Sequence, residues 1–160
     1  MNIQFKNLSS GEVAYERDLL PSQIDFWNAQ DRYVLFSGGY GCGKSMLLIM
    51  KTIYDSMSQD NNYILMGRKT YAEIHDVLLK DFFEICHPSW VKSFKKTPHP
   101  ALVLHTFNGK TSEIIFRNLD KFSTNEIAGL NLGGVSIDQA EDIPESIYIA
   151  LKGRLRREKI

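Results

Sequence analysis

The feature that most constrains this chain is a glycine-rich octapeptide between an apolar run and an amphipathic segment. It matches the pattern G-x-x-x-x-G-K-[ST] and consists of Gly38, Gly39, Tyr40, Gly41, Cys42, Gly43, Lys44 and Ser45. Glycines let the backbone curl so that successive N–H groups converge on phosphate oxygens, and a following helix adds the positive end of its dipole. Lys44 would then contact the β- and γ-phosphates, and the Ser45 hydroxyl would bind Mg²⁺. This phosphate loop predicts a site for ATP and Mg²⁺.

Apolar runs and amphipathic segments alternate along the chain. The pattern predicts a short helix over residues 19–27, buried strands over 33–37 and 63–67, and helices over 44–59 and 71–85. Residues 101–105 and 113–117 flank Asn108-Gly109, a strong hairpin signal, and 135–138 form a further short strand. A last helix is expected from about Asp142, with Glu145 completing a capping box. The alternation predicts an α/β fold, the three-layer architecture of P-loop nucleoside triphosphatases with a mainly parallel central sheet. Residues 1–20 are mixed and predict only an arm or an edge strand.

Composition limits the remaining possibilities. A chain of 160 residues is expected to form one domain, and its zero net charge gives no global attraction to nucleic acid or anionic membranes. The two cysteines, Cys42 and Cys86, lack metal-binding spacing, and a disulfide at Cys42 would obstruct the phosphate loop. The N-terminus does not resemble a signal peptide, and no apolar run approaches the ~18 residues of a membrane span. We therefore expect a soluble protein of a reducing compartment, without a membrane partner.

A triphosphatase of this kind also needs an acidic residue at the end of a neighbouring strand. Asp138 directly follows the apolar run 134–137 and is the candidate Walker B aspartate, which would hold Mg²⁺ through its water shell while Ser45 is a ligand of the ion. The next position is Gln139, whose amide is a poor acceptor for the proton of an attacking water. Two interpretations stay open: Glu141, three residues beyond Asp138, acts as the base, or hydrolysis is slow. We favour Glu141.

Other candidate residues have weaker support. Gln23 lies shortly before the first predicted strand, where an amide can recognise an adenine edge, although an exposed helical glutamine is an equal alternative. Arg68 and Arg117 follow predicted strands and are candidates for stabilising transition-state charge, unless each is solvated or paired with a carboxylate. The basic tail over residues 152–159 fits a helix C-terminus, or alternatively contact with phosphates.

Taken together, these residues resemble the large terminase subunit of tailed bacteriophages. The resemblance runs from about residue 19 to residue 157. It includes the Leu-Pro-Ser-Gln segment, the loop FSGGYGCGKS, the segment GRKT and the hairpin around Asn108-Gly109. It continues with FRNLD at 116–120, EIAGL at 126–130, IPE at 143–145 and GRLR at 153–156. The order and spacing of these segments are more specific than any one of them.

The resemblance implies an ATP-driven motor that moves double-stranded DNA into a procapsid in the cytoplasm of an infected bacterium. It also implies a portal protein, a small terminase subunit and a ring of several copies as partners. On this view residues 1–160 are the N-terminal part of one ATPase domain, and the nuclease domain of such proteins lies beyond them. Two positions depart from the family: Tyr40 stands where many members have an arginine, and Gln139 where many have a glutamate.

Three alternatives remain. Asp138-Gln139-Ala140-Glu141 also resembles the D-E-x-x box of helicase-like ATPases. A small-molecule kinase, with Arg154 and Arg156 as a lid, is less favoured. Gln139 also suggests an assembly module that switches shape on binding nucleotide with little turnover.

Overall fold

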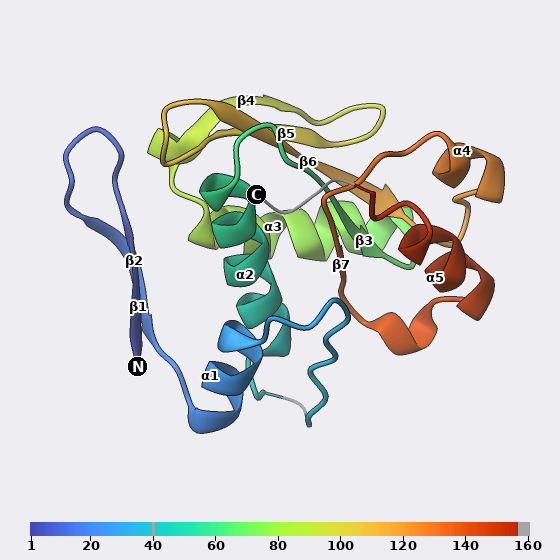
Figure 1. The fold of residues 1–160 in the computed structure, drawn as a ribbon, viewed down its shortest axis with the longest axis horizontal. Coiled ribbons are helices and arrows are strands. Elements are labelled where there is room, and N and C mark those ends of the chain that lie inside the picture. The colour runs from blue at the N-terminus through green and yellow to red at the C-terminus, as the bar shows by residue number, and fades with distance from the viewer. Residues whose placement is uncertain (40, 157–160) are drawn as a thin grey trace.

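One five-stranded sheet forms the centre of the protein in the computed structural model, which describes residues 1–39 and 41–156 (Figure 1). The strand order is β4-β5-β6-β3-β7. The strands are β3 (Tyr63–Arg68), β4 (Val91–Lys95), β5 (Ala101–His105), β6 (Thr111–Asn118) and β7 (Gly134–Ile137). Strands β6, β3 and β7 are parallel, while β5 runs antiparallel to both β4 and β6. Four strands therefore point one way and β5 the other, which confirms the mixed α/β class and the mostly parallel sheet.

Helices cover both faces of this sheet because its central strands are apolar on both sides. Ile64 and Met66 of β3 pack in the cluster that contains the helices α2 (Lys44–Ser58) and α3 (Leu79–Ile85). Leu65, between them, packs in a second cluster with α4 (Thr124–Ala128) and α5 (Glu145–Lys152). Successive strand residues point to opposite faces, so the continuous apolar run supplies both cores. The result is three layers, helix on sheet on helix.

Most predicted elements are present near their expected positions. The helix α1 (Pro21–Asn28) starts with Pro21 in its first turn, and α2 ends within a residue of its predicted end. The predicted helix over 71–85 consists of the π-helical turn η1 (Glu73–Leu78) followed by α3. Strands β5 and β6 form the predicted hairpin around Asn108-Gly109, with His105 opposite Thr111.

The last helix begins later than predicted. Residues Ala140–Asp142 form the short 3-10 turn η3, and α5 starts only at Glu145. Pro144 precedes the helix with φ −58° and ψ 138°. A proline disfavours helical conformation in the residue before it, and Ile143 is accordingly extended with ψ 134°. The capping box predicted from Asp142 and Glu145 is therefore not the start of this helix.

The predicted buried strand over residues 33–37 is wrong. These residues form no ladder with any described residue, and Leu35 is 81% exposed, with Tyr33 and Val34 exposed as well. An apolar run becomes a buried strand only where a sheet edge accepts its backbone hydrogen bonds. The segment is instead held at its start, where Arg32 donates to the Leu155 carbonyl over 3.3 Å and the Lys152 ammonium lies 4.9 Å from the Tyr33 ring centre.

The N-terminal residues form a hairpin that the sequence did not resolve. Strands β1 (Asn2–Lys6) and β2 (Val13–Asp18) pair antiparallel, outside the main sheet (Figure 1). Phe5 is 3% exposed and packs against Trp27 and Trp90, the latter in the short turn η2 (Pro88–Trp90). The Trp90 indole N–H donates to the Lys6 carbonyl over 2.7 Å. The hairpin is therefore anchored to the core beside α2.

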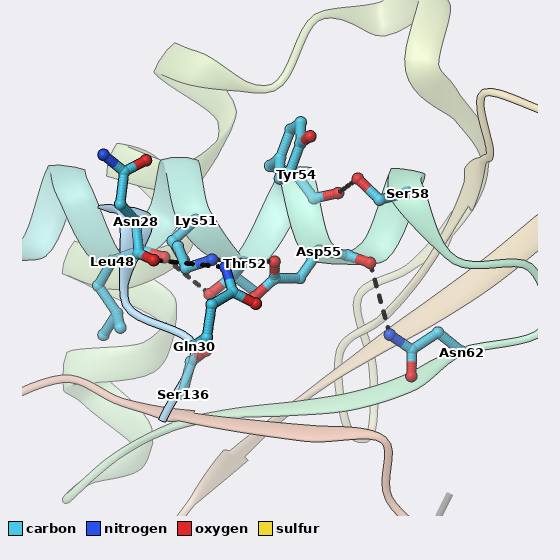
Figure 2. A network of polar contacts seen from close by, with 10 residues as sticks. All are labelled: Asn28, Gln30, Leu48, Lys51, Thr52, Tyr54, Asp55, Ser58, Asn62 and Ser136. Atoms are coloured by element: carbon cyan, nitrogen blue, oxygen red, sulfur yellow. Dashed lines mark hydrogen bonds and ion pairs between the residues drawn. The ribbon is translucent and has the colours of Figure 1, made fainter. Parts of the chain in front are cut away.

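Two hydroxyl contacts join α2 to the sheet, and Figure 2 draws the residues of the first, Thr52 and Ser136. Thr52 Oγ1 lies 2.7 Å from the Leu48 carbonyl and 2.7 Å from Ser136 Oγ on β7. One turn further, Ser56 Oγ lies 2.5 Å from Ser112 Oγ on β6. Because α2 begins at Lys44, these contacts set the phosphate loop against the end of β7. Within 1–39 and 41–156, no helix is long and apolar enough to cross a membrane.

Candidate nucleotide site

The phosphate loop leads directly into the N-terminus of α2. Gly41 and Gly43 both have φ 75°, a left-handed conformation that favours glycine, and Gly43 is the N-cap residue of α2. A Cβ at Gly38 would lie 2.9 Å from Cys42 Sγ, so a side chain there needs that thiol to move. Among the described residues no side chain caps α2. The helix therefore presents the positive end of its dipole to the loop, as an anion site requires.

Lys44 folds back across the loop. Its ammonium donates to the carbonyl of Gly38 and, over 3.1 Å, to that of Gly39. These are neutral acceptors, and the charged oxygens of a phosphate form stronger hydrogen bonds with an ammonium. Lys44 is thus placed to exchange loop carbonyls for phosphate oxygens.

Ser45 and Asp138 lie together although 93 residues separate them. The Ser45 hydroxyl donates to Asp138 Oδ1 over 2.9 Å. Asp138 directly follows β7, is 7% exposed, and donates its backbone N–H to the Gly67 carbonyl over 3.0 Å. The two residues predicted to bind Mg²⁺ therefore lie within one hydrogen bond of each other.

Arg68 approaches the same carboxylate from the adjacent strand. It is the last residue of β3, which is parallel to β7, so both strands end at the same edge of the sheet. Its Nε lies 3.5 Å from Asp138 Oδ2, and this buried nitrogen has no hydrogen-bond partner among the described residues. The Asp138 carboxylate thus lies between a hydroxyl and a guanidinium.

This donor set suits magnesium with bound phosphates. Mg²⁺ prefers oxygen ligands and usually keeps waters, using one or two carboxylates together with phosphate oxygens. Ser45 and Asp138 supply one hydroxyl and one carboxylate oxygen of this kind. In the described part of the chain, no three His, Cys, Asp or Glu side chains gather as a metal cage. The residues fit a metal that shares its coordination with a substrate.

An open cleft of about 2010 Å³ joins the phosphate loop to the free edge of β7. Lys44, Ser45 and Asp138 line it, as do Gln139 and Glu141. Gln139 has φ 57°, and Glu141 is exposed in η3. Gln139 and Glu141, the two residues considered for activation of the attacking water, therefore line the same cleft as the phosphate loop.

Gln23 is buried rather than exposed, at 3% exposed area. Its amide oxygen accepts the backbone N–H of Leu20 over 3.0 Å, and its amide nitrogen donates to the Cys42 carbonyl over 2.9 Å. The alternative of a solvated helical glutamine is thereby wrong. Gln23 clasps the phosphate loop from the side of α1, so both polar groups of its amide have protein partners.

Arg117 lies apart from these residues. Its Nη1 donates to the Phe116 carbonyl over 3.0 Å, and no ion pair among the described residues joins it to Asp138. Burial lowers the pKa of its guanidinium, an effect that nearby Tyr63, Glu126 and Glu113 partly offset. The structure brings Arg68, and not Arg117, together with Ser45 and Asp138.

Other sequence candidates have structural partners or lie outside the described residues. Arg154 donates to the Ala128 carbonyl over 2.9 Å, and Arg156 donates to the Gly153 carbonyl over 3.3 Å. Arg154 therefore joins the segment after α5 to the end of α4, whereas Arg156 bonds within its own segment. Tyr40 and residues 157–160 lie outside the described residues.

Two residues beside the phosphate loop were not among the candidates predicted from the sequence. Tyr15 and Arg17 both contact Met46, which follows Ser45 in the first turn of α2. Their alternation with Glu16 and Asp18 is typical of a strand with one covered face, and this pattern could have identified them.

The fold and the site define an α/β protein in which a glycine-rich loop and a strand-end aspartate meet at one edge of the sheet. No family model matches the sequence, and no curated protein matches it. Solved structures of the large terminase from a thermophilic bacteriophage do match. One crystal form is 17% identical with a TM-score of 0.71, over 89% of this chain and 37% of that chain.

Nucleotide complexes of the same terminase match as well. The complex with ADP has a TM-score of 0.63 at 19% identity, over 84% of this chain and 35% of that one. The complex with ATP-gamma-S has a TM-score of 0.57 at 17% identity, over 86% and 35%. This chain therefore shares its fold with a large terminase and spans about a third of that protein's length.

Proposed function

We propose that this chain is the Mg²⁺-dependent ATPase motor region of a viral DNA-packaging terminase. The observation that carries the proposal is the hydrogen bond from Ser45 to Asp138, which joins the phosphate loop to the end of β7. Structural neighbours described as large terminases in complex with ADP and with ATP-gamma-S support the choice of nucleotide and of class.

Binding of ATP uses groups that the loop leaves free or holds weakly. The N-terminus of α2 has no side-chain cap among the described residues and receives the phosphates. Lys44 exchanges the carbonyls of Gly38 and Gly39 for β- and γ-phosphate oxygens. Gln23 keeps the loop in shape by holding the Cys42 carbonyl.

Ser45 and Asp138 would hold a magnesium ion, whose charge would offset that of the phosphates. Arg68 keeps the Asp138 carboxylate in place and is the arginine best placed to stabilise charge in the transition state. Glu141 takes the proton from the attacking water, because the Gln139 amide next to Asp138 has no basic oxygen for it.

The partners follow from the same proposal. The motor translocates double-stranded DNA in the host cytoplasm, docks on a portal protein, receives DNA with a small terminase subunit and works as a ring of copies. We assign residues 1–160 to the N-terminal part of one ATPase domain and the nuclease activity to a separate domain.

Nucleotide binding to the purified chain tests the first half of the proposal. We expect ATP to bind in the presence of Mg²⁺, with affinity lost at least 100-fold in Lys44→Ala because an ammonium–phosphate contact disappears. Asp138→Asn should weaken binding of Mg-ATP more than binding of metal-free ATP. The matched control is Lys110→Ala, an exposed lysine in the distant hairpin turn. Failure of the wild-type chain to bind ATP would overturn the proposal.

Hydrolysis distinguishes the motor from its alternatives. The motor should release phosphate in the presence of double-stranded DNA, and Glu141→Gln should slow release by about 100-fold. A nucleotide-binding switch, which Gln139 favours, would bind ATP without turnover under any condition. A helicase-like ATPase would respond to single-stranded DNA instead.

A further inference from the structure

The N-terminal hairpin places the side chain of Arg17 beside the first turn of α2. On β2, the side chains of Tyr15 and Arg17 are half-buried, while those of Glu16 and Asp18 are exposed. The covered side chains reach α2 at Met46, where the Tyr15 hydroxyl lies 3.2 Å and Arg17 Nη1 lies 2.6 Å from the sulfur. Burial of Phe5 under the hairpin holds this face against the helix.

The Arg17 guanidinium has no anionic partner in the described part of the chain. No carboxylate forms a salt bridge with it. The neighbouring Glu16 and Asp18 instead accept hydrogen bonds from Gln4 and Asn2 on β1. A thioether sulfur is a weak acceptor, whereas a guanidinium carries five N–H donors. A charged group with so little compensation is suited to an anionic ligand.

The Arg17 guanidinium lies close to the phosphate loop at Gly43. Its Nη2 lies 3.8 Å from the point that a Cβ on Gly43 would occupy. Gly43 is the N-cap of α2, whose dipole is also positive at that end. Two positive groups side by side repel each other unless an anion lies between them or beside both.

The side of α2 on which Arg17 lies indicates which phosphate of the nucleotide it would contact. Figure 1 shows the hairpin on one side of this helix and β7, which leads to Asp138, on the other. The Ser45–Asp138 pair marks the metal and hence the end of the terminal phosphates. A group beside Gly43 and Met46 on the hairpin side therefore meets the part of the nucleotide nearer the ribose.

We propose that Arg17 is a nucleotide-binding residue that contacts the α-phosphate, with Tyr15 beside it. The proposal rests on the proposed function of the phosphate loop. A planar guanidinium binds two phosphate oxygens at once, which an ammonium cannot do. Arg17 therefore contributes equally to binding of ADP and of ATP, since both carry the α-phosphate.

Calorimetry with ADP and with ATP-gamma-S tests this on the whole chain in the presence of Mg²⁺. Arg17→Ala should weaken both ligands by the same factor, at least tenfold, as expected for loss of a charge-assisted contact. Arg17→Lys should recover part of the affinity, and Lys6→Ala, an exposed lysine on β1, should bind like the wild type. Arg17→Gln, which keeps much of the side-chain length without the charge, provides the same test if the alanine variant unfolds.

The outcomes separate this inference from the proposed function. Wild-type protein that binds neither ligand would defeat the proposed function itself. Tight binding of ADP by both Arg17→Ala and Arg17→Gln would overturn only the role of Arg17. A loss confined to ATP-gamma-S would also overturn it, because it would place Arg17 at the γ-phosphate. In steady-state hydrolysis, the KM for ATP should rise about tenfold while kcat changes less than about twofold.

Discussion

Two short apolar runs, residues 33–37 and strand β3, look alike in the sequence and differ in the structure. The first precedes the phosphate loop, and the second ends in Arg68. Strand β3 pairs with β6 on one edge and β7 on the other, and its residues 64–67 are buried. Residues 33–37 pair with no strand within 1–39 and 41–156, and most of them are exposed.

The difference shows that an apolar run needs a sheet edge as well as apolar side chains. In the described part of the chain, β7 pairs only with β3, and Leu132 just before it forms an isolated parallel bridge with Leu155. The backbone of Arg156 also donates to the Leu132 carbonyl over 3.1 Å. The start of the free edge of β7 is thus occupied by the segment after α5, and not by residues 33–37.

The candidate site does not depend on residues 33–37. Ser45 and Asp138 meet because α2 packs directly on the sheet, where Ile49 and Ile53 are fully buried. The helix therefore positions Ser45 beside Asp138 without help from residues 33–37.

Cysteine labelling should separate the two runs most strongly. In a Cys42→Ser background, we expect Leu35→Cys to react with iodoacetamide roughly a thousandfold faster than Leu65→Cys, which reacts only through opening of the fold. The native exposures behind this expectation are 81% for Leu35 and 0% for Leu65. Mass spectrometry of the time course gives both rates. Equal rates would show that residues 33–37 enter the sheet in solution.

Cys86 provides an internal reference for that experiment. Burial raises the pKa of its thiol to about 12, from an ordinary value of 9.0. Its thiolate fraction near neutral pH is therefore about a thousandfold below that of an ordinary cysteine, and labelling should accelerate as the pH rises toward 12. The neutral thiol stabilises the fold fully below pH 9, and this contribution is lost as the pH rises through about 12.

Alanine substitution should give the next largest contrast. Leu65→Ala should lower the free energy of unfolding by about 2–5 kcal/mol, because it leaves a cavity in the core. Leu35→Ala should change it by less than about 0.5 kcal/mol, as an exposed side chain makes few contacts. Urea titration followed by circular dichroism measures both. A similar loss in the two variants would contradict the exposed conformation of residues 33–37.

The sequence predicted the elements whose conformation depends mainly on their own residues. The period of α2, the apolar run of β3 and the turn at Asn108-Gly109 each specify their own element. The glycine pattern of the phosphate loop and the position of Asp138 after a strand identified the two residues that lie together at the proposed metal site. Their contact results from the packing of α2 on the sheet, because residues 33–37 form no strand that ends beside β7 in the described part of the chain.

Contacts between segments that are far apart in the sequence could not be predicted from it. Whether residues 33–37 find a partner depends on the far edge of β7, and the role of Arg17 depends on which face of a hairpin covers α2. The choice between Arg68 and Arg117 was open for the same reason. Arg68 lies on the strand next to Asp138, whereas Arg117 lies one strand further away, at the end of β6.

Removal of the contact between α2 and β7 should have the smallest effect of these changes. It tests whether this contact aligns Ser45 with Asp138 without help from residues 33–37. Ser136→Ala removes the hydroxyl that lies 2.7 Å from Thr52 Oγ1. We expect a loss of about 1 kcal/mol in stability, because Thr52 keeps its bond to the Leu48 carbonyl and leaves no polar group unsatisfied. The same variant should weaken binding of Mg-ATP about two- to threefold, since β7 carries Asp138 and its position relative to α2 becomes less fixed. Ser146→Ala, an exposed serine on α5, is the matched control. Unchanged nucleotide affinity in Ser136→Ala would show that packing of α2 alone aligns Ser45 with Asp138.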